Sequence, residues 1–281
     1  MSNFVMGIRL SIRVTAMITL CASCGAATGE IDMGQSKSGG SGGNFNVDFG
    51  SNGNVGGAVG GGVGNTGTAT EGSACGQLVA TIRDFSDQHP DFEKLPYVTG
   101  KVELGLVKAN LDKDRKPVYA FDKPTVITSQ DTFSQWYRDV NGVNQKFSVT
   151  LQLQETSPGI FVYDNDLFFP IDGKGFENQG RNHNFHFTTE IRGGFAYKGG
   201  EKFSFKGDDD VWVFVNGKLA IDIGGIHGKE TATIDFDAKA QELGITKGKT
   251  YSLDVFHAER HITESHFRME TSIQCLSVPV L

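Results

Sequence analysis

The sequence has little positive charge and no long apolar run after its N-terminus. Lys and Arg number 26 against 33 Asp and Glu, which gives a formal net charge of −7 and a pI near 5.5. This balance argues against nucleic acid as the main partner, because phosphate binding needs a basic face. Beyond the N-terminus there is no span of about 20 apolar residues, so no transmembrane helix is expected in the mature chain.

The sequence also lacks the common catalytic signatures. It contains no H-E-x-x-H and no P-loop pattern, and its one G-x-S-x-G match, GGSGG at 39–43, lies in a Gly-rich stretch and not between a strand and a helix. An EF-hand calcium loop is absent as well. These absences favour a non-enzymatic binding module over an enzyme.

The N-terminal residues 1–27 have the pattern of an export signal. Arg9 and Arg13 precede a short apolar segment, VTAMITLCA, and small residues follow it. Two cleavage sites compete: the small-x-small site at 25–27, and Cys24 as the lipidated first residue of a bacterial lipoprotein. The protein is therefore expected to be extracellular or at the cell surface, with outer-membrane anchoring if Cys24 is lipidated.

Composition divides the rest of the chain. Residues 28–74 are rich in Gly, Ser and Asn and lack the apolar density that offsets chain entropy, which predicts a disordered tether. Residues 75–275 have the composition of a globular β domain, and 276–281 form a tail. Cys75 and Cys275 are the only cysteines after the signal region, so a disulfide joining the ends of this domain is predicted. The alternative is two free, buried thiols.

The domain is expected to be all-β. Short alternating or apolar runs recur between Gly-Gly, Asn-Gly and Lys-Gly steps, as in an antiparallel sandwich or barrel. Residues 101–107 are among the expected strands. One or two short helices are predicted, over Asp131–Val140 and Asp237–Leu243.

The stretch from Lys206 to Gly228, KGDDDVWVFVNGKLAIDIGGIHG, predicts a hairpin. Asn216-Gly217 between apolar residues favours a two-residue type I′ turn, because both residues tolerate positive φ. With this turn, Val215 pairs with Lys218, and counting back places Val211 opposite Asp222.

Four carboxylates are thus expected at the open end of the hairpin: Asp208, Asp209, Asp210 and Asp222. Like charges at such range raise one another's pKa unless a cation lies among them. Calcium, a hard cation with oxygen ligands, suits an exported protein best. The alternative is an acidic loop in water that ends the strand.

Several motifs together resemble the fibro-slime domain. Besides the hairpin, they are IRDFSDQHPDFE (82–93), YDNDLFFPIDGKGF (163–176), NFHFTTEI (184–191) and YSLDVFHAERHITESHFRMETSI (251–273). That domain occurs in bacterial surface proteins and secreted slime-mould proteins, and it is similar to the larger protective-antigen-type β-sandwich of adhesins. The resemblance implies an antiparallel, jelly-roll-like β-sandwich.

The resemblance also implies a ligand. In the lectin-like relatives, an Asp-Asp pair joined by a cis peptide holds a calcium ion that contacts sugar hydroxyls. Asp208 and Asp209 match that pair, so calcium at these residues and a carbohydrate partner are expected. Asp210 stands where many relatives have glycine, so the sugar-facing loop is expected to differ.

Four further residues are candidates for ligand contacts. His227 follows a glycine pair close after Asp222 and is expected to flank the cation site. His257, Arg260 and His261 lie where one strand ends and the next begins. The His spacing of i, i+4 is typical of zinc only on a helix, so structural or ligand-facing roles are favoured. Arg260 is a candidate to offset the carboxylate charge.

These expectations leave three functions open. The first is calcium-dependent carbohydrate binding or adhesion at the cell surface. The second is a structural matrix or coat protein in which calcium only stabilises the fold. The third is a polysaccharide hydrolase that uses the paired acids.

Overall fold

The structure, a computed structural model, describes residues 75–93 and 100–276. The predicted export signal, the lipidation site Cys24 and the tether lie outside the described residues. All the described residues belong to one compact unit, Asn65–Leu281. In this described part, no helix is both long and apolar enough to cross a membrane.

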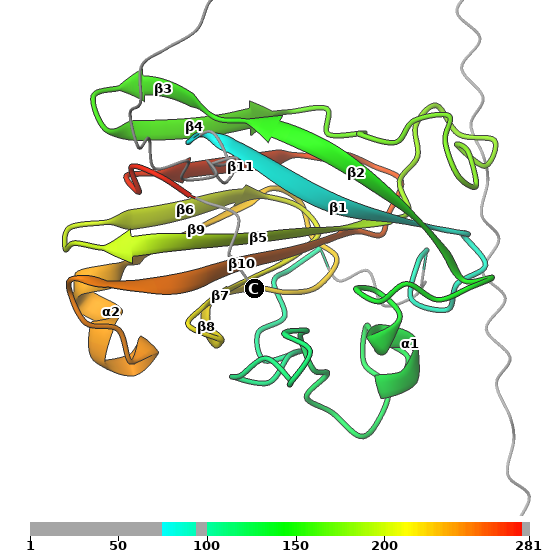
Figure 1. The fold of residues 1–281 in the computed structure, drawn as a ribbon. Coiled ribbons are helices and arrows are strands. Elements are labelled where there is room, and N and C mark those ends of the chain that lie inside the picture. Colours follow the sequence, from blue (N-terminus) through cyan, green and yellow to red (C-terminus); the bar gives the residue numbers. More distant parts are fainter. Residues whose placement is uncertain (1–74, 94–99, 277–281) are drawn as a thin grey trace, which may run out of the picture. The chain divides into compact units, whose positions relative to one another are not determined.

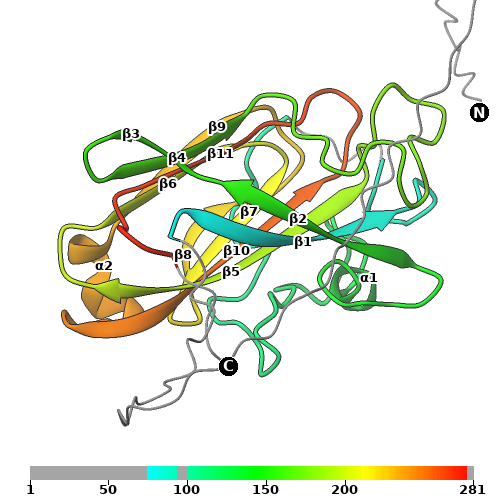
Figure 2. The same ribbon diagram turned by 45° about the horizontal axis from the view of Figure 1, so that its top comes forward.

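The domain is an all-β sandwich of two antiparallel sheets, as predicted (Figures 1 and 2). The six-stranded sheet has the order β2-β1-β5-β10-β7-β8, and the five-stranded sheet has the order β3-β4-β11-β6-β9. The strands are β1 Gln77–Phe85, β2 Asn144–Gln152, β3 Gln154–Ser157, β4 Ile160–Asn165, β5 Phe187–Tyr197, β6 Lys202–Gly207, β7 Asp210–Val215, β8 Lys218–Ile223, β9 Glu230–Asp235, β10 Lys249–Glu259 and β11 Phe267–Thr271.

The main core lies between the two sheets and follows from the alternation of side chains along each strand. On β7, Val211, Val213 and Val215 point into this core, as do Leu253 and Val255 on β10. The predicted disulfide between Cys75 and Cys275 is present, and it closes a loop of 200 residues at the ends of the sandwich.

A second core covers the outer face of the six-stranded sheet. The segment 100–143, which includes α1 (Gln130–Ser134), packs there, and Figure 1 shows it beneath β7 and β8. Trp136, Phe133 and Tyr137 from this segment meet Trp212 and Phe256 from the sheet. Because both faces of β7 are covered, all of its residues are buried.

Capping residues explain where the two short helices begin and end. Ser129 begins α1 with a capping box that it shares with Thr132. Asp235 caps α2 (Phe236–Leu243), and Gly244 ends it in the left-handed conformation that glycine adopts without strain. Both helices start near the predicted positions, but α1 ends six residues before the predicted Val140.

Two differences from the sequence-based expectation concern strands. Residues 101–107 form no strand; only Val107 makes an isolated bridge, to Tyr119. The segment makes only isolated backbone bonds to the edge strand β8 and its end, such as that from the N–H of Glu103 to the backbone oxygen of Gly224. The sequence patterns missed β3 and also β1, which lies between β2 and β5 in the six-stranded sheet.

Candidate functional site

The acidic triplet lies at the end of the sandwich where β7 begins and β10 ends. Asp208, Asp209 and Asp210 are all buried, and so are Glu259 and Arg260 from the end of β10. Four carboxyl groups and one guanidinium are thus buried in a region with little access to water. Such an excess of buried negative charge is costly unless another cation is present.

The carboxylate of Asp208 is fixed by His266. Its Oδ1 accepts from the backbone N–H of His266 and its Oδ2 lies 2.6 Å from Nδ1 of the same residue. The Asp208–Asp209 peptide bond is cis. The backbone oxygen of Asp208 accepts from Nε2 of His257 over 2.8 Å.

Asp209 is fixed by backbone donors from two loops. Its Oδ1 accepts from the N–H of His227 and its Oδ2 from the N–H of Arg260, both over 3.1 Å. Since each carboxylate oxygen has two lone pairs, these bonds orient the group and leave acceptor capacity on both oxygens. The glycine pair before His227 allows this close approach, because Gly225 has a φ of 103°.

Glu259 lies close to Asp209. The last pair between β10 and β7 is Ala258 with Asp210, and one further residue along both strands brings Glu259 beside Asp209. Oε2 of Glu259 is buried and has no hydrogen-bond partner among the described residues. Burial raises the pKa of Glu259 well above its ordinary value, and repulsion by Asp209 and Asp208 adds to the rise. Burial also raises the pKa of Asp209, although Arg260 opposes it.

Asp210 differs from Asp208 and Asp209 because its carboxylate pairs with an arginine side chain. Its Oδ2 accepts from Nε of Arg260 over 2.6 Å, and its Oδ1 accepts from the N–H of Gly225 over 2.6 Å. Arg260 also donates to the backbone oxygens of Asp91 and Val126. The expectation that Arg260 offsets carboxylate charge is confirmed, because its guanidinium pairs with Asp210.

Of the structural and ligand-facing roles left open for His257 and Arg260, the structure supports the structural one. Both side chains are fully buried, because β10 continues to Glu259 and carries them into the two cores. His257 is surrounded by aromatic rings, and Phe267 lies edge-on at 5.2 Å. Burial lowers the pKa of His257 to about 4, so its ring is neutral at physiological pH.

The structure does not bring Asp222 into the cluster. A bulge between Val213 and Phe214 shifts the hairpin, so Trp212, and not Val211, lies opposite Asp222. The carboxylate of Asp222 accepts from Nε1 of Trp212 at 3.0 Å and from the N–H of Gly105 at 2.7 Å. The predicted pairing was wrong because the segment 100–143 bonds to β8: the N–H of Leu219 donates to the backbone oxygen of Ala109.

The remaining predicted residues lie around the cluster. His227 flanks it through its backbone, as expected, and Nε2 of its buried ring has no partner among the described residues. His261 is half-buried and its Nδ1 lies 3.0 Å from Oε2 of Glu93. Thus His261 pairs with an acid next to the cluster and does not touch the aspartate triplet.

Two further features adjoin Asp208. Ligand atoms of Asp208, Glu264 and His266 lie within 4.8 Å of one another. Beside His266 is a polar hollow of about 150 Å³, whose lining includes Asp164, Asp166, Lys206 and Arg268. The cluster therefore lies next to a surface recess rich in hydrogen-bonding groups.

The fold and this site define an antiparallel β-sandwich with a buried acidic cluster at one end of its strands. Residues 171–278 match the model of the PA14 domain. This range contains the whole aspartate triplet, Glu259 and His266, so the match supports a PA14 domain in the part of the chain that carries the site.

Curated relatives come from Dictyostelium discoideum. The protein psiQ is 46% identical over 190 residues, which are 62% of this chain and 19% of psiQ. The protein psiD is 41% identical over 211 residues, which are 70% of this chain and 41% of psiD. The chain thus spans less than half the length of the curated relatives it matches.

Solved structures with a similar fold are distant in sequence. The PA14 sugar-binding domain from an RTX adhesin is 10% identical, covering 73% of this chain and 100% of that domain, with a TM-score of 0.34. The Epithelial Adhesin 9 A domain from Candida glabrata, in complex with Galb1-4GlcNAc, is 11% identical, covering 72% of this chain and 90% of that domain, with a TM-score of 0.31. Similarity at this level places no ligand on the present chain.

Proposed function

We propose that this chain is an exported, calcium-dependent carbohydrate-binding module of the fibro-slime type. The observation that carries the proposal is the buried cluster of Asp208, Asp209 and Glu259, which gathers more carboxyl groups than Arg260, already paired with Asp210, can balance if all are ionised. The export signal, the matched Asp-Asp pair and the PA14 match support the same function.

The donor set fits calcium. Calcium binds six to eight oxygens, many of them from carboxylates. Asp208 and Asp209 would supply oxygens whose orientation is fixed by backbone N–H groups. Glu259 would supply Oε2, the buried oxygen that lacks a hydrogen-bond partner. A bound calcium would balance these charges and keep all three side chains ionised.

The recess beside His266 supports carbohydrate as the ligand. It is polar, and Asp164, Asp166, Lys206 and Arg268 offer both donors and acceptors that suit sugar hydroxyls. In the lectin-like relatives that this chain resembles, the Asp-Asp loop holds a calcium ion, and that ion contacts the sugar. A sugar bound here would lie next to Asp208.

One observation favours the second function, a structural matrix or coat protein. Asp208 and Asp209 are only 3% and 4% exposed, so a calcium ion among them could serve the fold alone. The hydrolase has less support, because Glu259, whose raised pKa would suit a general acid, is 1% exposed and out of reach of a polysaccharide.

Calorimetric titration of the full chain with calcium tests the metal site. We expect binding that is lost in Asp208→Asn/Asp209→Asn and weakened at least tenfold in Glu259→Gln, whereas Glu242→Gln on α2 binds as the wild type does. Equal calcium binding by all four proteins would refute the site.

A glycan array with calcium and with EDTA tests the ligand. Calcium-dependent binding to a glycan supports the module proposed here. Calcium binding without any glycan signal would instead favour the structural function, and turnover of a polysaccharide would favour the hydrolase.

A further inference from the structure

The six-stranded sheet leaves part of its outer face uncovered by the segment 100–143. A hollow of about 270 Å³ lies there, with Val79, Thr81 and Arg83 of β1 along its floor. Lys146 of β2 and Arg192 of β5 border it, and Lys116 reaches in from the covering segment. The hollow shares no residue with the cluster around Asp208.

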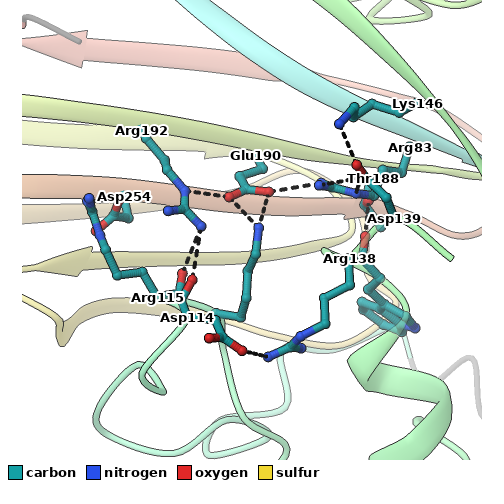
Figure 3. A network of polar contacts seen from close by, with 12 residues as sticks. Arg83, Asp114, Arg115, Arg138, Asp139, Lys146, Thr188, Glu190, Arg192 and Asp254 are labelled. Atoms are coloured by element: carbon teal, nitrogen blue, oxygen red, sulfur yellow. Dashed lines mark hydrogen bonds and ion pairs between the residues drawn. The ribbon is translucent and has the colours of Figure 1, made fainter. Parts of the chain in front are cut away.

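One buried acid binds three of the cations. Glu190 on β5 is 5% exposed, and its Oε2 lies 2.8 Å from Nη1 of Arg83 and 2.6 Å from Nζ of Lys116. Its Oε1 accepts from Nε of Arg192 over 2.6 Å. Figure 3 shows Glu190 between Arg83 and Arg192, with Arg115 and Asp254 farther along the same face.

The fourth cation, Lys146, forms its ion pair with a second acid. Lys146 pairs with Asp139, which also accepts from Arg83. Four cations therefore share two carboxylates, and the hollow carries an excess of positive charge in a chain whose net charge is −7. The side chains of Lys146 and Arg192 are 53% and 26% exposed, so both can reach a ligand.

The lowered pKa of Lys116 reflects its burial and the same excess of positive charge. Burial lowers the pKa of Lys116 to about 8, and the nearby charges of Arg192 and Arg83 add to the lowering, although Glu190 opposes it. An anion in the hollow would favour the charged form of this lysine.

We propose that this hollow binds the acidic groups, carboxylate or sulfate, of an anionic polysaccharide. Arg83 and Arg192 present the planar donors that match such groups, and Lys116 and Lys146 add point charges. Thr81 gives the floor a hydroxyl, and the exposed Ser148 and Thr150 continue along β2 beside it. A chain of sugars would thus meet hydroxyls and cations together.

The lining favours a polysaccharide over single-stranded nucleic acid. Stacking on aromatic side chains supplies much of the affinity for unpaired bases. The hollow is lined by Val79, Thr81 and charged side chains, with no aromatic residue among them. The hollow and the proposed calcium site have no residue in common, so each can be tested without the other.

The test uses the full chain with two polyanions, each against its neutral counterpart. Dextran sulfate is compared with dextran for the sulfate arm, and polygalacturonate with its methyl ester for the carboxylate arm. We expect binding to at least one polyanion and to neither neutral polymer, in EDTA as well as in calcium. If the chain does not bind calcium at the Asp208 cluster, the binding of polyanions should be unchanged.

Two variants assign the binding to the hollow. Lys146→Gln/Arg192→Gln should weaken it at least tenfold, whereas Lys202→Gln/Lys239→Gln, which loses the same charge elsewhere, should bind as the wild type does. Val79→Glu adds a negative charge to the lining of the hollow, where Val79 is 48% exposed, and removes no partner of an ion pair. It should weaken binding as well.

The absence of binding to both polyanions would overturn the proposal. So would equal loss in the hollow and control variants, or unchanged binding by Val79→Glu. Tighter binding of a single-stranded oligonucleotide than of either polysaccharide would also overturn it.

Discussion

Nε of Arg260 donates to Oδ2 of Asp210 over 2.6 Å, and both side chains are fully buried. The guanidinium also lies over the ring of Trp136, with its central carbon 4.9 Å from the ring centroid. Asp91 and Val126 accept from it through their backbone oxygens. This ion pair therefore joins the end of β10 to the start of β7 and to the segment that covers the sheet.

Removing the guanidinium should destabilise the fold strongly. Arg260→Met leaves Asp210 as an unpaired buried charge, for which we expect a loss of about 3–5 kcal/mol in the free energy of unfolding by urea. Arg268→Met, which breaks exposed pairs with Asp164 and Glu270, should cost at most about 1 kcal/mol. In Asp210→Asn/Arg260→Met the loss should be smaller than the sum of the two single losses; additive losses would mean that the pair is not coupled.

Asp222 should not contribute to calcium binding. Its carboxylate is bonded to Trp212 and Gly105 on the covered face of the sheet. Asn at this position keeps an oxygen for Trp212, so Asp222→Asn should retain the calcium affinity of the wild type within about twofold, whereas Asp209→Asn should lose at least tenfold. Calorimetry on both variants decides it, and a large loss in Asp222→Asn would return this residue to the ligand set.

Calcium binding should release protons at acidic pH. The raised pKa values of Asp209 and Glu259 mean that these carboxyls keep their protons to higher pH in the folded state than in the unfolded state. They therefore stabilise the calcium-free fold less as pH rises through those values. Because calcium binds the ionised form, its affinity should rise over the same range.

Calorimetry at pH 6 in two buffers of different ionisation enthalpy measures the release. We expect proton release on calcium binding in the wild type and less release in Glu259→Gln. Glu242→Gln, which changes an exposed acid on α2, is the control and should release as many protons as the wild type. Identical binding enthalpies in both buffers would contradict the assignment of the protonated acids.

Local patterns predicted the hairpin turn but not the register beyond it. Asn216 and Gly217 have φ values of 52° and 73°, and Val215 pairs with Lys218, as expected. The bulge that moves Asp222 away from Val211 arises from contacts between β8 and residues 109–111. Those residues lie about a hundred positions earlier in the sequence, so turn chemistry alone could not reveal their effect.

Strand alternation contained a signal for Glu259 that the sequence analysis did not use. Leu253, Val255 and His257 point to the main core or its end, and Glu259 continues the same face. An acid on an apolar face is informative, because burial of its charge requires a partner. His266 and Glu264 carried no such signal, since a loop of unknown path brings them to Asp208.

The basic hollow was not predicted because its residues come from distant parts of the chain. Arg83 belongs to β1, a strand whose pattern was missed, and Lys116 comes from the covering segment. Glu190 lies beside Arg83 because Thr81 of β1 pairs with Glu190 of β5. Such pairing of distant strands depends on the whole sandwich, not on local sequence.

Reduction of the disulfide should destabilise the domain. The bond between Cys75 and Cys275 closes a loop of 200 residues, and in the chain-entropy model such a constraint stabilises by up to about 5 kcal/mol. We expect dithiothreitol to lower the Tm of the full chain by roughly 10 °C. Cys75→Ser/Cys275→Ser should melt at the lower temperature whether or not dithiothreitol is present. A wild-type Tm that does not respond to reduction would mean that packing between β1 and the chain after β11 holds the two ends together without the bond.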